Sequence, residues 1–504
     1  MTHRPARSTA LTAAALAAMA TLMAPATGRA QDTLHAGQAA VVLDYQQVRV
    51  PGDEDIDFMG FHLHHRVGER LWLGAGVYAP LLRGQYGGFT AFDVGVHWRQ
   101  PLSGPLSAVA GLSGGGGGGG RSVEQSKVLS GTGGFYKGYV GLDWDFGGFT
   151  LGANVAKMAF RNSAIDSTHA NLVLTIPYGY QAGDYTRSGQ ALDERDLGAS
   201  DGGESLLMAT LDSYRQLDPQ GTFKGTVRSA DLQYAHYLGR DTYWFGALGV
   251  GVQGLALYNQ VMGGLGQRVR LSPSLNLYGQ LAVGSGGYAP EKIDTDAGLL
   301  VYPRVAAEWM VGRDTGLALS AGYLWAPKGS SRNLTYGLAL TQHLRSGTEA
   351  AAGGTPHWQG FRVGVFQQTE YRVSYRGEDR DALQLVGVQV DAPLDARWYI
   401  PVQAAVAYNA YLGYPGYGEL LAGLGAQTLA APGDRLQAFA QLMGGSNVHG
   451  LGVKAGAGVR WLVDERLSVQ LSAGRIEARN PSGRRFSADS ALLGLEYRFA
   501  VPVR

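Results

Sequence analysis

Apolar and polar residues alternate along most of the chain, most regularly between Gln359 and Val501. Successive side chains of a β-strand point to opposite faces, so this period of two predicts strands. In the last segment the residues of one face are Leu493, Leu495, Tyr497 and Phe499. Turn residues divide the region into eight segments that we predict to be strands: 359–373, 382–395, 398–410, 417–430, 434–447, 450–464, 466–480 and 484–501.

The connections between these segments alternate in length. Residues 395–397, 432–434 and 464–466 form tight turns, and the connections between them, such as 376–380 and 412–416, are longer. Membrane β-barrels have short turns at one end and long loops at the other. The alternation therefore predicts a membrane barrel whose two chain ends lie on the short-turn side.

The same eight-strand pattern occurs three times, in repeats of about 143 residues. The repeats span 37–180, 204–346 and 359–501, and two polar linkers, 181–203 and 347–358, separate them. We predict an all-β protein, a transmembrane antiparallel β-barrel built from three tandem eight-strand repeats. The first linker is rich in charged residues, and we expect it to be solvated.

Charged residues in the sixth strand of the first and third repeats lie on the face that also carries glycine. A charge on the lipid-facing side near mid-membrane costs roughly 2–4 kcal/mol, so the opposite, apolar face is expected to meet lipid. The residues that we predict to face the lumen are Lys137, Asp143, Asp145, Arg304, Glu308, Lys454 and Arg460.

Tryptophans recur at one end of the predicted strands. Trp144, Trp309 and Trp461 lie near the turn between the sixth and seventh strands, and Trp244 and Trp398 begin the third strand. Aromatic side chains of membrane barrels gather where the barrel meets the lipid headgroups. These five tryptophans are predicted to form such a belt.

Composition and the N-terminus agree with an exported β-protein. The 76 glycines among 504 residues are unfavourable in helices, where each costs about 1 kcal/mol. Arg4 and Arg7, an apolar stretch and small residues before position 30 predict a signal peptide at 1–30. The formal net charge of +1 argues against a nucleic-acid partner, and the absence of cysteine excludes thiolate metal sites.

The final strand contains the spacing Gly494-x-x-Tyr497-x-Phe499. This spacing resembles the C-terminal recognition sequence of Gram-negative outer-membrane β-barrels, although five residues follow the last aromatic. The resemblance covers this strand only. It implies that the chain is inserted into the outer membrane, in contact with its lipid, by the outer-membrane assembly machinery.

Three repeats of eight strands can close as one barrel of 24 strands or as three barrels of eight. Equal repeat lengths, a 23-residue first linker and many small inward residues favour three barrels. The single terminal signal favours one barrel, as do inward faces such as Lys454, Gly456, Gly458 and Arg460, which lack the bulky packing of a filled bore. We expect one barrel of 24 strands, in which the first strand pairs with the last.

Two motifs could indicate a binding site, one for phosphate and one for a metal ion. The glycine run 114–120 lacks the lysine and the helix of a phosphate-binding loop, so we predict a mobile loop. His62, His64 and His97 with Asp93 could converge on a metal ion, but we expect them to be polar residues facing the lumen. We predict no catalytic residue, metal or cofactor.

The expected function is a porin-like or export channel for an unidentified solute or polymer. The alternative is a non-transporting barrel that presents surface loops for adhesion or envelope structure. A lipid-modifying enzyme of the outer membrane is a third possibility, although no pair of residues stands out as catalytic. Conductance separates the first two, because filled eight-strand barrels conduct little.

Overall fold

The computed structural model describes residues 35–120, 129–192, 204–255, 258–288, 291–312, 314–344, 357–429, 434–480 and 483–503. The predicted signal peptide lies outside the described residues. Residues His35–Arg504 form one compact unit. Within the described ranges, no helix combines the length and hydropathy that a bilayer span requires.

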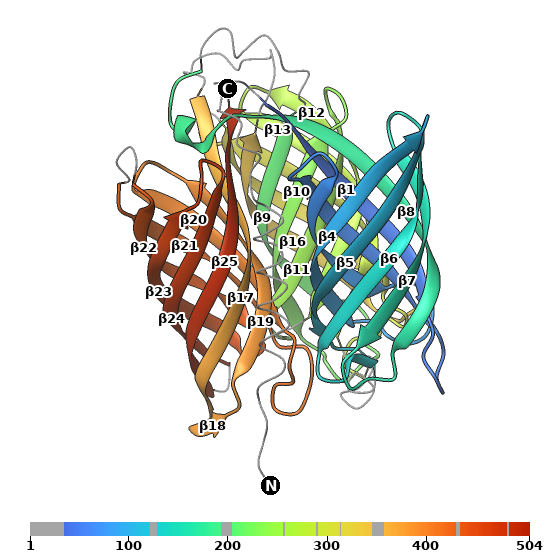
Figure 1. Ribbon diagram of the computed structural model, residues 1–504. Coiled ribbons are helices and arrows are strands. Elements are labelled where there is room, and N and C mark those ends of the chain that lie inside the picture. The colour runs from blue at the N-terminus through green and yellow to red at the C-terminus, as the bar shows by residue number, and fades with distance from the viewer. Residues whose placement is uncertain are drawn as a thin grey trace, which may run out of the picture. The chain divides into compact units, whose positions relative to one another are not determined.

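Barrel 1 is a closed antiparallel barrel of eight strands (Figure 1). Its last strand pairs with its first, so that Val41 faces Ile176. The strands are β1 (His35–Val48), β2 (Ile56–Arg66), β3 (Leu71–Pro80), β4 (Thr90–Ser103), β5 (Leu106–Gly118), β6 (Gly134–Asp145), β7 (Thr150–Phe160) and β8 (Asp166–Ala182).

Barrel 2 repeats this topology, and Leu211 of its first strand faces Leu338 of its last. The strands are β9 (Ser205–Gln216), β10 (Thr226–Tyr237), β11 (Thr242–Gln253), β12 (Asn259–Ser272), β13 (Leu275–Gly287), β14 (Leu299–Met310), β15 (Thr315–Trp325) and β16 (Arg332–Leu344).

Barrel 3 closes through pairing of β17 with β25, and the short β18 extends β17 as a hairpin. The strands predicted for this repeat agree with the structure to within three residues at every boundary. The strands are β17 (His357–Tyr375), β18 (Glu378–Arg380), β19 (Leu383–Pro393), β20 (Trp398–Ala407), β21 (Gly418–Gln427), β22 (Leu436–Asn447), β23 (Gly450–Leu462), β24 (Leu467–Arg479) and β25 (Arg485–Val503).

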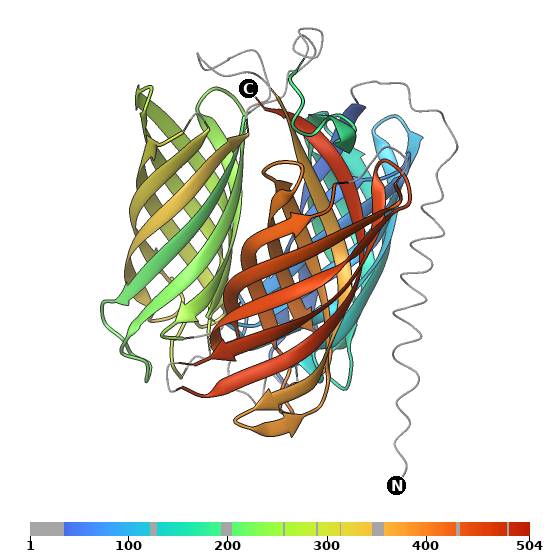
Figure 2. The ribbon, with the colours of Figure 1, turned by 90° about the vertical axis from the view of Figure 1, so that its left-hand side faces the viewer.

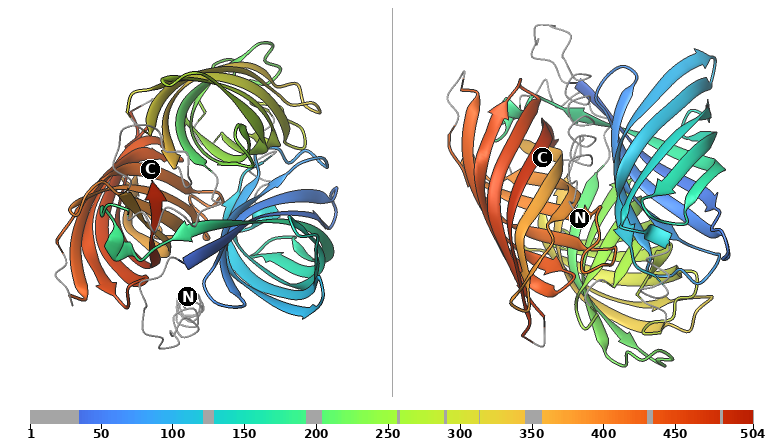
Figure 3. Two further views of the ribbon diagram at one scale, coloured as in Figure 1. Left: turned by 90° about the horizontal axis from the view of Figure 1, so that it is seen from above. Right: turned by 60° about the horizontal axis from the view of Figure 1, so that its bottom comes forward.

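The structure contradicts the single 24-strand barrel, because the first strand of each repeat pairs with the eighth strand of the same repeat. Each barrel is a separate closed ring when viewed end-on (Figure 3, left). The inward face of β23 does not leave an open bore, because its Lys454 and Arg460 are 4% and 0% exposed. Other inward glycines make room for large neighbouring side chains. A Cβ on Gly425 would lie 2.1 Å from the ring of Tyr399, and one on Gly266 would lie 2.2 Å from the ring of Tyr243.

The outside of the barrels is apolar. Exposed side chains include Val140, Leu211 and Leu451, with exposed fractions of 64%, 63% and 57%. The predicted faces of the sixth strand are observed: Val140 and Trp144 point outward, whereas Lys137 is 2% exposed. Closed barrels satisfy their backbone hydrogen bonds internally, so this apolar exterior is suited to lipid.

We call the end that carries the short turns the terminal end and the opposite end the loop end. In each barrel, buried apolar and aromatic side chains fill the interior near the loop end. Members of these clusters are Phe58, Phe89, Phe135 and Phe160 in barrel 1, Val227, Tyr258, Ile293 and Leu324 in barrel 2, and Tyr375, Leu383, Tyr411 and Phe486 in barrel 3.

The prediction of a mobile loop at the glycine run is wrong for most of the run. Gly114 to Gly118 belong to β5 and pair with β4 and β6. A Cβ on Gly116 would lie 2.3 Å from the carbonyl oxygen of Ala407, and one on Gly118 would lie 2.8 Å from the backbone nitrogen of Gly416. The glycines therefore allow barrel 1 to approach the backbone of barrel 3.

The described part of the first linker bonds to barrel 3, so the prediction of a solvated linker is wrong for this part. It contains the 3₁₀ helix η1 (Tyr185–Arg187). Gly183 pairs with Ala500, and the backbone nitrogen of Gly360 donates to the hydroxyl of Ser188. We call residues 183–192 the strap. Residues 193–203 of this linker and most of the second linker lie outside the described ranges.

Candidate functional sites inside the barrels

Each barrel holds a cation from its sixth strand against a polar side chain of its first strand. Lys137 of β6 forms an ion pair with Asp44 of β1. Arg304 of β14 lies 3.4 Å from Asp212 of β9. In barrel 3, the Lys454 ammonium donates to Gln368 of β17 at 2.6 Å. Buried charges need partners, and this repeated pairing supplies them across each lumen.

Barrel 3 has a second ionic cluster nearer its terminal end. Arg460 donates to Asp391 at 2.7 Å and to Glu496 at 3.2 Å, and Arg362 donates to the same Asp391 oxygen at 3.1 Å. The Arg460 guanidinium carbon lies 4.1 Å from the ring centre of Phe439. Arg460 is 0% exposed, so the bore at this level is filled by side chains.

The strap closes this cluster from the terminal end. The Tyr185 hydroxyl accepts a hydrogen bond from Arg362 at 2.8 Å. The Arg498 guanidinium lies 5.2 Å from the Tyr185 ring centre, within cation–π range. A residue from the segment that follows barrel 1 thus completes the interior of barrel 3.

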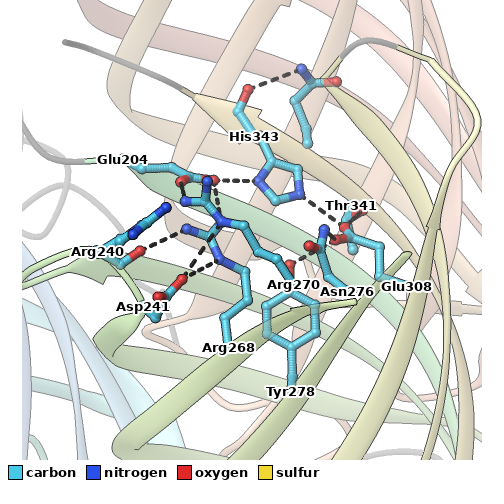
Figure 4. A network of polar contacts seen from close by, with 11 residues as sticks. Glu204, Arg240, Asp241, Arg268, Arg270, Asn276, Tyr278, Glu308, Thr341 and His343 are labelled. Atoms are coloured by element: carbon cyan, nitrogen blue, oxygen red, sulfur yellow. Dashed lines mark hydrogen bonds and ion pairs between the residues drawn. The ribbon is translucent and has the colours of Figure 1, made fainter. Parts of the chain in front are cut away.

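Figure 4 shows a third network, at the terminal end of barrel 2. Nδ1 of His343 lies 2.6 Å from Glu204, and Nε2 lies 2.9 Å from Glu308. Both ring nitrogens can donate only in the imidazolium form, so this geometry fits a cationic His343 between two carboxylates. Arg268 donates to the same Glu204 oxygen at 2.7 Å.

Glu204 stands just before β9, outside the barrel strands. Burial alone would raise the pKa of Glu204, but hydrogen bonds from His343 and Arg268 lower it to about 2. Glu308 is held further inside, where it accepts hydrogen bonds from Tyr278 at 2.7 Å and Asn276 at 2.8 Å. The network joins the first and last strands of barrel 2, because Glu204 precedes β9 and His343 lies at the end of β16.

Barrel 1 contains the histidines singled out in the sequence. Rings of His64 and His97 stack at 3.9 Å, and His62 lies 3.2 Å from Asp93. His97 also contacts the Tyr139 hydroxyl at 2.9 Å. Within the described residues, these groups do not form a set that could hold a metal ion. The three histidines and Tyr139 line a cavity of about 80 Å³, which reaches Trp72 and Arg99 near the terminal end.

The structure buries six of the seven residues predicted to face the lumen. Lys137, Arg304, Glu308, Lys454 and Arg460 take part in the networks above, and Asp143 lines the cavity of barrel 1. Asp145 differs from the prediction. It is exposed at the rim, where it accepts a hydrogen bond from the backbone nitrogen of Gly147 at 2.7 Å and thereby stabilises the turn.

Four of the five tryptophans predicted to meet lipid headgroups are exposed, namely Trp144, Trp309, Trp398 and Trp461. Trp244 is 9% exposed, because Tyr178 of barrel 1 covers it at a ring distance of 6.0 Å. The prediction for Trp244 is therefore wrong: its outward face meets another barrel.

The aromatics of the predicted assembly signal lie at another contact between barrels. Tyr497 and Phe499 of β25 point outward, and both contact the His65 ring of barrel 1, at 4.8 and 6.2 Å. Gly494 lies inside the same strand, opposite Phe366. Their role in assembly stays a prediction.

Sequence reasoning missed Glu204, His343, Arg362 and Tyr185. The inward parity of β17 could have indicated Arg362, which shares a face with Gln368. Glu204 and Tyr185 lie outside the strands, where alternation gives no signal. Their positions depend on how the chain leaves one barrel and enters the next.

Closed antiparallel barrels with an apolar exterior and an ionic interior have the architecture of an integral membrane β-barrel. No family model and no curated protein matches the sequence.

Solved structures of ferric enterobactin and siderophore receptors share only a remote likeness with this chain. A ferric enterobactin receptor of Pseudomonas aeruginosa is 12% identical, with 92% of this chain and 81% of that chain covered and a TM-score of 0.29. The siderophore receptors PirA of P. aeruginosa and of Acinetobacter baumannii are 12% and 10% identical. They cover 94% and 93% of this chain and 81% of their own length, with TM-scores of 0.26 and 0.27. At these scores the likeness carries no argument about mechanism.

Proposed function

We propose that the protein is a non-conducting outer-membrane anchor, in which three filled barrels hold a surface of loops at the cell exterior. The observation that carries this proposal is the filled interior. In each barrel the loop end is packed with apolar side chains, and ionic networks cross the bore below them. Barrels of eight strands have an interior that side chains can fill.

The loop ends of barrels 1 and 2 also bond to each other. Asn259 donates to the carbonyl oxygen of Gly88 at 3.0 Å and contacts the hydroxyl of Thr90 at 2.6 Å. The Ser285 hydroxyl donates to the carbonyl oxygen of Pro80. Loops held in this way form a joint surface, which suits recognition or envelope structure. The short-turn ends would then face the periplasm, and insertion would use the outer-membrane assembly machinery.

Conductance of the full protein in planar bilayers tests the proposal. We expect no steady current steps at neutral pH. Stable steps would overturn it in favour of the porin-like or export channel. One observation favours that second candidate: the cavity of about 80 Å³ in barrel 1, which Lys137 and Asp143 help to line, could be part of a gated path.

Cysteine labelling of intact cells tests the orientation, because the native chain has no cysteine. Tyr414→Cys places a thiol in an exposed connection at the loop end, and Ala396→Cys places one in a turn at the terminal end. A membrane-impermeant maleimide should label the first variant only. Labelling of the second variant alone would contradict the proposed orientation.

A further inference from the structure

The outside of barrel 3 has a groove among its lipid-facing side chains. Figure 2 turns strands β22 to β25 toward the viewer. The register aligns Ala457 of β23, Ala473 of β24 and Ala491 of β25 in one row across the sheet. Larger outward residues flank this row, including Leu471 and Leu493. The small side chains leave a groove of about 380 Å³.

Charged residues occupy the next outward-facing position of the strands beyond the groove, toward the loop end. On β24 the outward residue after Ala473 is Arg475, and on β25 the residue before Ala491 is Asp489. These two residues face each other, and Arg475 donates to Asp489 at 2.9 Å. The boundary between apolar and charged surface therefore falls at the same register on both strands, as expected where lipid tails give way to headgroups.

The charged surface has more arginine than carboxylate. We call Arg372, Arg475, Arg479 and Arg485 the arginine cluster. Arg372 and Arg475 share the one carboxylate of Asp489, at 3.3 and 2.9 Å, and Arg475 also bonds to Glu477 at 3.0 Å. Four arginines against two carboxylates leave a formal charge of +2.

Two members of the arginine cluster directly oppose each other. Arg479 ends β24 and faces Arg485 at the start of β25, and both side chains are exposed. Within the described residues, neither forms an ion pair. Like charges directly opposite on neighbouring strands are destabilising, so an anion between them would relieve a cost that the protein alone does not relieve. Arginine is well suited to phosphate, which it binds through two parallel hydrogen bonds.

We propose that barrel 3 binds a phosphate-bearing membrane lipid on its outer face, with an acyl chain in the groove and the phosphate on the arginine cluster. The groove wall also offers Gln367 and Thr369, which bond to each other at 3.1 Å and can turn polar atoms toward the linkage between headgroup and chain. This site would fix lipid around the protein, which goes beyond the anchoring role.

The test uses the full protein in detergent, with lipid adducts counted by native mass spectrometry. The probes are dipalmitoyl phosphatidic acid, dipalmitoyl phosphatidylcholine and inorganic phosphate. The headgroup variant is R479Q/R485Q, and A473L/A491L fills the groove. The matched control is R397Q/R435Q, which removes two exposed arginines from the terminal end.

We expect the wild type to retain phosphatidic acid in preference to phosphatidylcholine. R479Q/R485Q should weaken phosphatidic acid binding on the order of tenfold, A473L/A491L should weaken both lipids, and R397Q/R435Q should bind like the wild type. Equal binding by R479Q/R485Q and the control would overturn the proposal. Displacement of the lipid by millimolar inorganic phosphate would also overturn it, since the site would then be a phosphate site without a role for the groove. Heat-modifiability on gels verifies that every variant is folded.

Discussion

Arg362, inside barrel 3, donates a hydrogen bond of 2.8 Å to the hydroxyl of Tyr185, which lies 177 residues earlier in the segment that leaves barrel 1. The strap therefore does more than connect barrels 1 and 2. It places an aromatic side chain over two buried arginines, Arg362 and Arg498, at the terminal end of barrel 3. The packing of these arginines inside barrel 3 therefore depends on Tyr185, a residue from outside the third repeat.

Replacing Tyr185 tests this contact. Tyr185→Ala removes both the hydrogen bond and the ring, and should lower the stability of barrel 3 by about 1–3 kcal/mol. Tyr185→Phe keeps the ring and should have a smaller effect, on the order of 1 kcal/mol. Thermal unfolding in detergent measures both variants. Equal stability of Tyr185→Ala and the wild type would show that the strap does not seal the barrel.

The ion pair of Lys137 and Asp44 crosses the interior of barrel 1, where both side chains are buried. Lys137→Met leaves Asp44 charged and without its cation, so we expect a loss of about 3–5 kcal/mol in the free energy of unfolding. Lys157→Met is the control, because the ion pair of Lys157 and Asp166 is exposed on the same barrel. It should cost less than about 1 kcal/mol. Similar losses in both variants would contradict the buried position of Lys137.

The glycine run gives a matched pair on one face of β5. A Cβ on Gly116 would lie 2.3 Å from a backbone oxygen of barrel 3, whereas one on Gly114 would lie 3.5 Å from its nearest neighbour. Gly116→Ala should therefore destabilise the protein by about 1–3 kcal/mol, and Gly114→Ala should be nearly neutral. Chemical denaturation compares the two variants. If Gly114→Ala is as harmful as Gly116→Ala, the glycines do not serve the contact with barrel 3.

The pH dependence of barrel 2 follows from Glu204. Its carboxylate is favoured by folding, since its pKa is lowered from 4.5 to about 2. The stabilisation is therefore complete above about pH 4.5 and is lost as the pH falls toward 2. Glu204→Gln should reduce stability at neutral pH and flatten the pH dependence between these values. Melting temperatures measured across this range should converge for wild type and variant at the acidic end. A constant difference between the two at every pH would contradict the lowered pKa of Glu204.

The strands could be predicted from the sequence because lipid imposes a strict period of two on every spanning segment. The interior could not be predicted as well, because alternation tells which face a residue occupies and not what lies opposite. The inward face of β23 suggested an open bore, yet its Lys454 and Arg460 are buried against side chains of β17 and β19. Similarly, Trp244 has the sequence context of a lipid-facing aromatic but packs on Tyr178, since contacts between barrels leave no periodic signal.

Closure of three separate barrels is the central claim, and disulfide crosslinking tests it most directly. The native chain has no cysteine, so pairs can be placed across each seam without interference. The within-repeat pairs are Leu43 with Leu174, Leu211 with Leu338, and Val365 with Leu495, each facing its partner in the register. The comparison pair, Leu43 with Leu493, joins the first strand to the last as a 24-strand barrel requires. We predict that oxidation crosslinks all three within-repeat pairs and leaves the comparison pair open. Crosslinking of Leu43→Cys to Leu493→Cys, with the three within-repeat pairs unlinked, would contradict the account.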